Sequence, residues 1–226
     1  MGFASAFGSL NSGGRGRSTH ATNYGRVLYW NYLKAVIRTS HSFPASPDST
    51  KMAHALEKLP DQIQEHLRLV FVGTAAGQRS ADVGHYYAHP GNRFWRTIHE
   101  VGITPRRYEA HEFPALLNLG IGFTDVCKLG AGMDYQALAF PVDIPAFREK
   151  MQHFRPETIA FTSKKAASLF YGRPTKAIAL GRQPPQQDFP NVFVLASPSG
   201  AASRYWSIQP WQQLADSISP KDRRMG

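Results

Sequence analysis

The sequence predicts an α/β fold in three layers, with helices covering both sides of a central four-stranded, mainly parallel sheet. Two observations predict it. Four short apolar runs have the length of buried strands, and segments with helical periodicity and helix start or stop signals lie between them. This alternation is typical of parallel strands joined by helical crossovers.

The expected strands, in order, are 67–73, 122–126, 158–162 and 192–196. The expected helices are 94–102, opened by Asn92 as a cap, 144–154, and 163–172, closed by Gly172. The run KAIALG at 176–181 fits an additional strand or a sheet edge.

We expect residues 58–218 to form one domain, preceded by a basic, partly disordered extension over 1–57 and followed by a tail over 219–226. The extension fits a flexible DNA-binding arm, an organellar transit peptide, or translation from a start codon upstream of the real one. Tyr29, Leu33 and Val36 recur at helical spacing, which argues against simple disorder. We favour a dispensable extension, with Met52 as an alternative start.

The formal net charge of +10 favours a polyanionic partner such as DNA. Residues 1–60 hold seven Lys and Arg against two acidic residues, and 61–226 hold nineteen against fourteen, so each part contributes +5. The single cysteine, Cys127, excludes an internal disulfide and a cysteine-built zinc or iron–sulfur site, and fits a reducing compartment. No apolar run is long enough to cross a bilayer, so we expect a cytoplasmic protein of the bacterial cytosol or nucleoid.

Parallel sheets bind ligands at the carboxyl ends of their strands, which directs attention to the loops at Gly73, Asp125, Ser163 and Ser197. The first loop is the most informative. Gly73 and Gly77 bracket a tight turn after a strand, where backbone amides can approach a ligand closely. The segment GHYYAHPGNRFW follows within the same 23 residues.

These motifs resemble the mismatch-specific uracil/thymine-DNA glycosylases of the uracil-DNA glycosylase superfamily. The matching positions are Gly73, Gly77, Ser80-Ala81, Gly84, Tyr87-Ala88-His89-Pro90, Asn92-Arg93-Phe94-Trp95, Gly120 to Asp125 and Ser197-Pro198-Ser199-Gly200. Order and spacing agree over roughly residues 66 to 215.

The resemblance implies a DNA repair enzyme that removes a flipped uracil, with Tyr87 stacking on the base. It implies a base pocket formed by Gly73, Thr74, Ala75, Gly77, Tyr87 and Asn92. It also implies a DNA-binding loop that contains Ser197, Ser199, Gly200, Ala201, Ser203 and Arg204. Ala201 and Ala202 are too small to fill the gap left by a flipped base, so Arg204 or Tyr205 is expected to do so.

The chain departs from the family pattern at Ala75, which stands where mismatch-specific members carry a water-positioning Asn. A carboxylate near the pocket can align water and stabilise an oxocarbenium-like sugar. Asp82 is the first candidate and Asp125 the second, while His85 offers a donor and an acceptor for the leaving base or for water. Each also has a structural interpretation: a helix cap, a loop anchor and a surface residue, respectively.

No nucleophile elbow, Walker A loop or HExxH helix is present in the sequence. His85 and His89 have the spacing of metal ligands on a helix, but Pro90 argues against a helix there. We therefore expect a monomeric, monofunctional glycosylase without metal or cofactor that acts on single- or double-stranded DNA. The alternative is a glycosylase fold that has lost its chemistry and binds damaged or single-stranded DNA. A third interpretation, a small-molecule α/β hydrolase, needs a nucleophile and a base that are not recognisable in this sequence.

Overall fold

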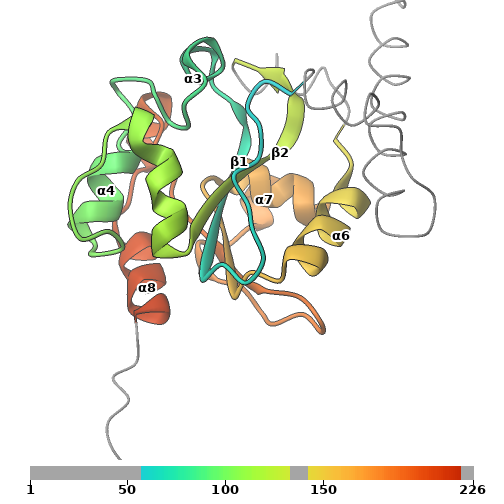
Figure 1. Ribbon diagram of the computed structural model, residues 1–226. Coiled ribbons are helices and arrows are strands. Elements are labelled where there is room, and N and C mark those ends of the chain that lie inside the picture. The colour runs from blue at the N-terminus through green and yellow to red at the C-terminus, as the bar shows by residue number, and fades with distance from the viewer. Residues whose placement is uncertain (1–56, 133–141, 220–226) are drawn as a thin grey trace, which may run out of the picture.

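A computed structural model describes residues 57–132 and 142–219, and its centre is a five-stranded sheet (Figure 1). The strands are β1 (Leu69–Ala76), β2 (Ile121–Ala131), β3 (Thr158–Phe161), β4 (Gly181–Arg182) and β5 (Asn191–Val194). Their order across the sheet is β2-β1-β3-β5-β4. Every pair is parallel except the short edge pair of β4 with β5.

Helices cover both faces of this sheet (Figure 1). One side carries α4 (Phe94–Glu100), the 3-10 segment η1 (Ala110–Leu119) and α8 (Gln209–Ile218), and the other carries α6 (Ile144–Phe154) and α7 (Lys164–Tyr171). Three short elements complete the described chain: α3 (Gln78–Val83), η2 (Thr175–Ala177) and η3 (Gly200–Tyr205). The expected three-layer α/β/α arrangement is confirmed.

The apolar core is divided between the two faces because successive residues of a strand point to opposite sides. In β1, Leu69 and Phe71 enter the cluster beneath α4 and α8, whereas Val70 and Val72 enter the cluster beneath α6 and α7. The first cluster is rich in aromatic rings. Phe71, for example, lies 4.9 Å from Phe94 and 6.0 Å from Trp211 between ring centroids. These packed aromatic rings support α4 and the segment before it.

The four expected strands are present, and the fifth, β4, begins at the last residue of the KAIALG run. The sequence analysis gave four strands because two-residue β4 is too short to produce an alternating pattern. The three expected helices are also present as α4, α6 and α7, although α4 ends at Glu100, two residues before the expected end. Gly172 closes α7 with a positive φ of 62°, and Ser163 caps its start by accepting a hydrogen bond from the Ala166 amide. The elements α3, η1 and α8 were not predicted from the sequence.

No helix within 57–132 and 142–219 is long and apolar enough to cross a membrane. The helical spacing of Tyr29, Leu33 and Val36 and the alternative start at Met52 fall outside the described residues. The proposed domain start at 58 lies next to Glu57, whose side chain is 1% exposed and packs into the body.

Candidate active site

The loops that leave β1, β2 and β3 meet at one edge of the sheet. Gly73 of β1 lies directly opposite Asp125 of β2 in the parallel register. Thr162 follows β3, and its amide donates a hydrogen bond to the Val72 carbonyl of β1. Three residues from distant parts of the chain, Gly73, Asp125 and Thr162, are therefore brought to the carboxyl ends of adjacent strands, where parallel sheets bind ligands.

The carboxyl group of Asp125 occupies the space next to Gly73. A Cβ atom at Gly73 would overlap Asp125 Oδ1 and would lie 3.3 Å from Cγ and 3.7 Å from the Tyr87 hydroxyl. Asp125 is only 4% exposed. The missing side chain of Gly73 thus allows a buried carboxylic acid and a tyrosine hydroxyl to share a small space.

Tyr87 is held in a defined orientation at this position. Its backbone has a positive φ of 54°, which is uncommon for a residue with a side chain. Its ring stacks on Phe94 with centroids 3.9 Å apart and planes 14° apart, and its hydroxyl lies 3.2 Å from Thr162 Oγ1. Backbone strain is retained where surrounding packing over-determines it, often at functional sites. Phe94 and Thr162 provide such packing for Tyr87.

Burial changes the ionisation of both groups. The removal of Asp125 from water raises its pKa to about 6, although the nearby Lys128 ammonium acts in the opposite direction, and the Asp61 carboxylate adds to the increase. Burial, followed by the charge of Asp125, raises the pKa of the Tyr87 hydroxyl. Tyr87 is therefore neutral at physiological pH, whereas Asp125 titrates close to it and can exchange a proton there.

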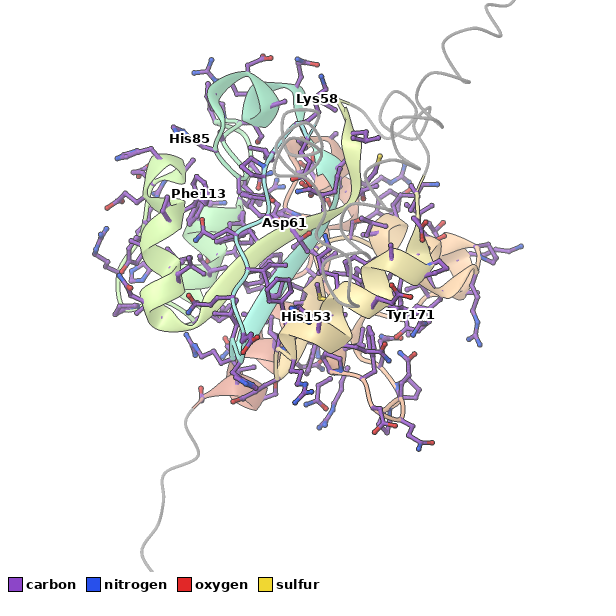
Figure 2. The ribbon with its side chains drawn as sticks, turned by 45° about the vertical axis from the view of Figure 1, so that its right-hand side comes forward. Lys58, Asp61, His85, Phe113, His153 and Tyr171 are labelled. Atoms are coloured by element: carbon purple, nitrogen blue, oxygen red, sulfur yellow. The ribbon has the colours of Figure 1, made fainter. Side chains whose placement is uncertain are left out.

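The other two catalytic candidates lie elsewhere. Asp82 is on α3 and exposed, where its Oδ1 accepts a 2.7 Å hydrogen bond from Gln78 Nε2. The ring of His85 is half-buried beside Phe113, 6.1 Å away between centroids, and beside His111 at 6.4 Å (Figure 2). Neither has a contact with Asp125 or Tyr87 among those found in the described residues. The geometry therefore favours Asp125 over Asp82 as the acting carboxylate.

The remaining base-pocket candidates lie along the first loop and at the start of α4. Thr74 Oγ1 lies 3.1 Å from Ser163 Oγ, which connects the loop to the start of α7. Ala75 is half-buried in β1, opposite Cys127 in the register, and Gly77 is exposed at the start of α3. Asn92 Oδ1 accepts a hydrogen bond from the Phe94 amide, so that oxygen caps the first turn of α4.

The expected DNA-binding loop packs against the end of the first motif through Arg93. The Arg93 amide donates to the Pro198 carbonyl, and its Nη2 donates to Ser203 Oγ at 2.9 Å. Its guanidinium also lies over the Trp206 ring, 5.5 Å from the centroid. Gly200 fits against the Gly91 carbonyl, which would lie 3.1 Å from a Cβ at Gly200. The two motifs therefore form one surface.

On this surface, the predicted DNA-binding residues differ in accessibility. Gly200, Ala201, Ser203 and Arg204 are exposed, and Ser197 and Ser199 are half-buried. Tyr205 is the most exposed large apolar side chain in the described chain, at 77%. An exposed aromatic ring beside two small alanines is available for contact with another molecule.

Comparison with known proteins identifies the family of this chain. The model of the uracil DNA glycosylase superfamily matches residues 60–215, which include every strand and every site residue described above. The chain belongs to this superfamily. Membership supports a role as a DNA glycosylase, a hydrolase of N-glycosidic bonds that acts in base excision repair.

One solved structure has the same fold as this chain. The chain is similar to a candidate uracil DNA glycosylase from Methanosarcina acetivorans, solved by NMR in solution, with 21% identity and a TM-score of 0.51. The similarity covers 71% of this chain and 96% of the other. It supports the uracil-DNA glycosylase-like sheet and helices.

Three residues that contact the candidate site were not among the predicted ones. Thr162 bonds the Tyr87 hydroxyl, Phe94 supports its ring, and Arg93 connects the two motifs. Thr162 could have been predicted from its position, because it ends the third strand and precedes the loop at Ser163. In the described residues, no group of three or more His, Cys, Asp or Glu side chains could hold a metal ion.

Proposed function

We propose that the protein is a monofunctional uracil-DNA glycosylase that hydrolyses the N-glycosidic bond of a flipped uracil and leaves an abasic site. One observation carries the proposal: a buried carboxylic acid, Asp125, lies against Gly73 and near the Tyr87 hydroxyl at the ligand-binding edge of the sheet. The motif resemblance supports placing the chain in the mismatch-specific branch, with Ala75 in the position of the water-positioning Asn.

In this mechanism Asp125 replaces the missing Asn. When ionised, its carboxylate stabilises the positive charge that develops on the sugar as the bond from C1′ to the base breaks. The bonding electrons leave with the base, a water oxygen bonds to C1′, and the carboxylate takes up a proton from that water. A group with a pKa of about 6 can then release this proton to solvent near neutral pH.

The base is proposed to stack on Tyr87, whose orientation is supported by Phe94 and Thr162. Base–aromatic stacking contributes about 1–3 kcal/mol, which offsets part of the cost of flipping the nucleotide. Asp82 and His85 remain weaker candidates, because their contacts are with Gln78 and with the Phe113 and His111 rings.

The loop at Ser197–Arg204 is proposed to contact DNA, with Ser199 and Ser203 as phosphate donors and Tyr205 as the group that fills the gap. The exposure of Tyr205 favours it over Ala201 and Ala202, which are too small. We propose a monomer that acts in the cytosol or nucleoid. The small side chains of Ala75 and Ala76 also suggest a pocket that accepts bases larger than uracil.

An end-labelled oligonucleotide with one uracil tests the activity, presented as a single strand and paired with G or A, followed by alkali. The proposal requires alkali-dependent strand breaks at the uracil, and comparison with ethenocytosine measures the substrate range. Intact strands in every context, together with tight binding of the same DNA, would support the alternative of an inactive damage-binding module.

A further inference from the structure

A second group of charged side chains gathers around Lys128, three positions after Asp125 in β2 and outside the pocket residues considered so far. Lys128 of β2 has a side chain that is only 5% exposed, and its Nζ lies 2.8 Å from Asp61 Oδ1. Lys150 of α6 lies 2.6 Å from the other oxygen of Asp61, and Glu57 lies 3.8 Å from Lys128 Nζ. Two lysines and two carboxylates thus form a buried network.

This network is connected to the pocket through β2 and Tyr86. Thr124, the neighbour of Asp125 in β2, donates a 2.6 Å hydrogen bond to Asp61 Oδ1, the same oxygen that Lys128 contacts. Lys128 Nζ lies 3.5 Å from the Tyr86 hydroxyl, and the Tyr86 ring lies 6.2 Å from the Tyr87 ring. Asp61 lies near the centre of the view in Figure 2.

Burying four charged groups is expensive, and their mutual attraction seldom gives a net stabilisation. An apolar filling of the same volume would serve the fold at least as well. A buried lysine beside a pocket is therefore better explained by an effect on a neighbouring group. The neighbouring group that changes charge near neutral pH is Asp125.

We propose that Lys128 is a positioning residue that favours the charged, water-binding form of Asp125, and that Asp61 limits this effect by pairing with the same ammonium. The proposal rests on the assignment of Asp125 as the acting carboxylate. Lys128 does not touch the substrate in this account, and it acts through the Asp125 carboxyl group alone.

The charged groups and the titratable hydroxyls and thiol around Asp125 enter the balance, and burial together with the charge of Asp125 raises the pKa of the Cys127 thiol, which stays neutral. Lys128 and the more distant Lys150 favour the carboxylate, whereas Asp61 and Glu57 oppose it. The Tyr87 and Tyr86 hydroxyls are neutral near pH 7, because burial and the charge of Asp125 raise both pKa values. In return, the carboxylates of Asp61, Asp125 and Glu57 outweigh burial and raise the pKa of Lys128, so it remains charged.

The balance predicts effects of opposite sign for two substitutions in one network. Lys128→Met removes the favourable charge at similar length, so Asp125 should titrate at least one pH unit higher. Asp61→Asn removes the opposing charge and releases the ammonium from its pair, so Asp125 should titrate at lower pH. Loss of packing alone would not shift the Asp125 titration in opposite directions in the two variants.

The experiment follows the Asp125 carboxyl carbon by NMR as pH is varied, in full-length protein labelled with ¹³C-aspartate and assigned with Asp125→Asn. Single-turnover excision of uracil is measured over the same pH range. Lys58→Met is the matched control, because it removes an exposed lysine three positions before Asp61. It should leave the Asp125 titration unchanged. Lys128→Arg should restore most of the parental titration.

Opposite shifts for Lys128→Met and Asp61→Asn, matched by the pH dependence of excision, are the expected result. Unchanged titration in both variants, or a shift in the same direction, would overturn the role of Lys128. If Lys128→Met does not fold, the direction of the Asp125 shift in Asp61→Asn still tests the balance, and Lys128→Arg tests whether a positive charge at this position is sufficient. If the parent excises no uracil, the proposed function fails, while the carboxyl titration still tests the charge network.

Discussion

Asp125 Oδ1 lies where the Cβ of a side chain at Gly73 would begin, and Asp125 Cγ lies 3.3 Å from that position. Gly73→Ala should therefore displace Asp125 and the nearby Tyr87 hydroxyl. The sheet register holds the backbones of Gly73 and Asp125 opposite each other. We therefore expect excision to fall by at least tenfold and stability to fall by roughly 1–3 kcal/mol, as in other overpacked sites. Excision assays and thermal unfolding measure the two effects.

Gly77→Ala is the matched control for stability, because a Cβ at Gly77 meets nothing within 4 Å. Its free energy of unfolding should stay within about 0.5 kcal/mol of the parent. Equal destabilisation by the two alanines would contradict the close contact between Gly73 and Asp125.

The buried Asp125 should make stability depend on pH. Its pKa is about 6 in the folded protein and near 3.8 when exposed, so between these values the folded state binds the additional proton. Stability therefore falls as pH rises from about 4 to 6, and the full penalty remains above that range. Asp125→Asn avoids it and should be more stable than the parent by roughly 1–3 kcal/mol at pH 8.

Denaturant unfolding of both proteins at pH 4 and pH 8 measures this difference, which should nearly vanish at pH 4. A variant that is less stable than the parent at pH 8 would contradict the burial of an ionised carboxylate. Groups that lower stability but are needed for catalysis are common at active sites.

Tyr87 is expected to contribute through its ring more than through its hydroxyl. Tyr87→Ala removes the stacking surface, so excision should fall by roughly tenfold to a hundredfold, in line with about 1–3 kcal/mol for one stacked base. Tyr87→Phe keeps the ring and loses the hydrogen bond to Thr162, which contributes about 1 kcal/mol to stability. Equal loss of excision in both variants would assign the hydroxyl, rather than the ring, to the base.

Arg93 should control how the DNA-binding loop is presented. Arg93→Ala removes the bond to Ser203 and the contact with Trp206, so DNA affinity should weaken by about tenfold while excision of bound substrate at saturation changes less. Ser203→Ala should give a smaller effect of the same kind.

Arg96→Ala is the charge-matched control, because Arg96 is exposed on α4 one turn along from Arg93. Fluorescence anisotropy with a short duplex at two salt concentrations separates the effects. An equal loss of affinity in Arg96→Ala and Arg93→Ala would indicate a general effect of charge.

The sequence predicted the sheet well because continuous apolar runs leave strong local patterns, and the Gly and Ser caps do the same for the helices, as at Gly172 and Ser163. It predicted that Asp125 lies near the ligand-binding edge, since a polar residue that ends a strand has little freedom of position. It gave Asp82 the higher rank because separation along the chain does not reveal orientation. The short helix α3 turns Asp82 outward to Gln78.

The buried role of Lys128 had no local signal, because a lysine after a strand usually lies in solvent. Its burial depends on β2 continuing to Ala131, well past the expected end at 126, and on Asp61, which is 67 positions earlier in the chain. Contacts of this range are properties of the folded chain, and a pattern of neighbouring residues does not contain them.

The central claim, that the Asp125 carboxylate activates the water that hydrolyses the bond to uracil, is tested most directly by single-turnover excision with Asp125→Asn and Asp82→Asn side by side. Circular dichroism confirms that each variant is folded. The account predicts that Asp125→Asn loses at least a hundredfold in rate while Asp82→Asn stays within about threefold of the parent. Full activity in Asp125→Asn, or a loss confined to Asp82→Asn, would contradict it.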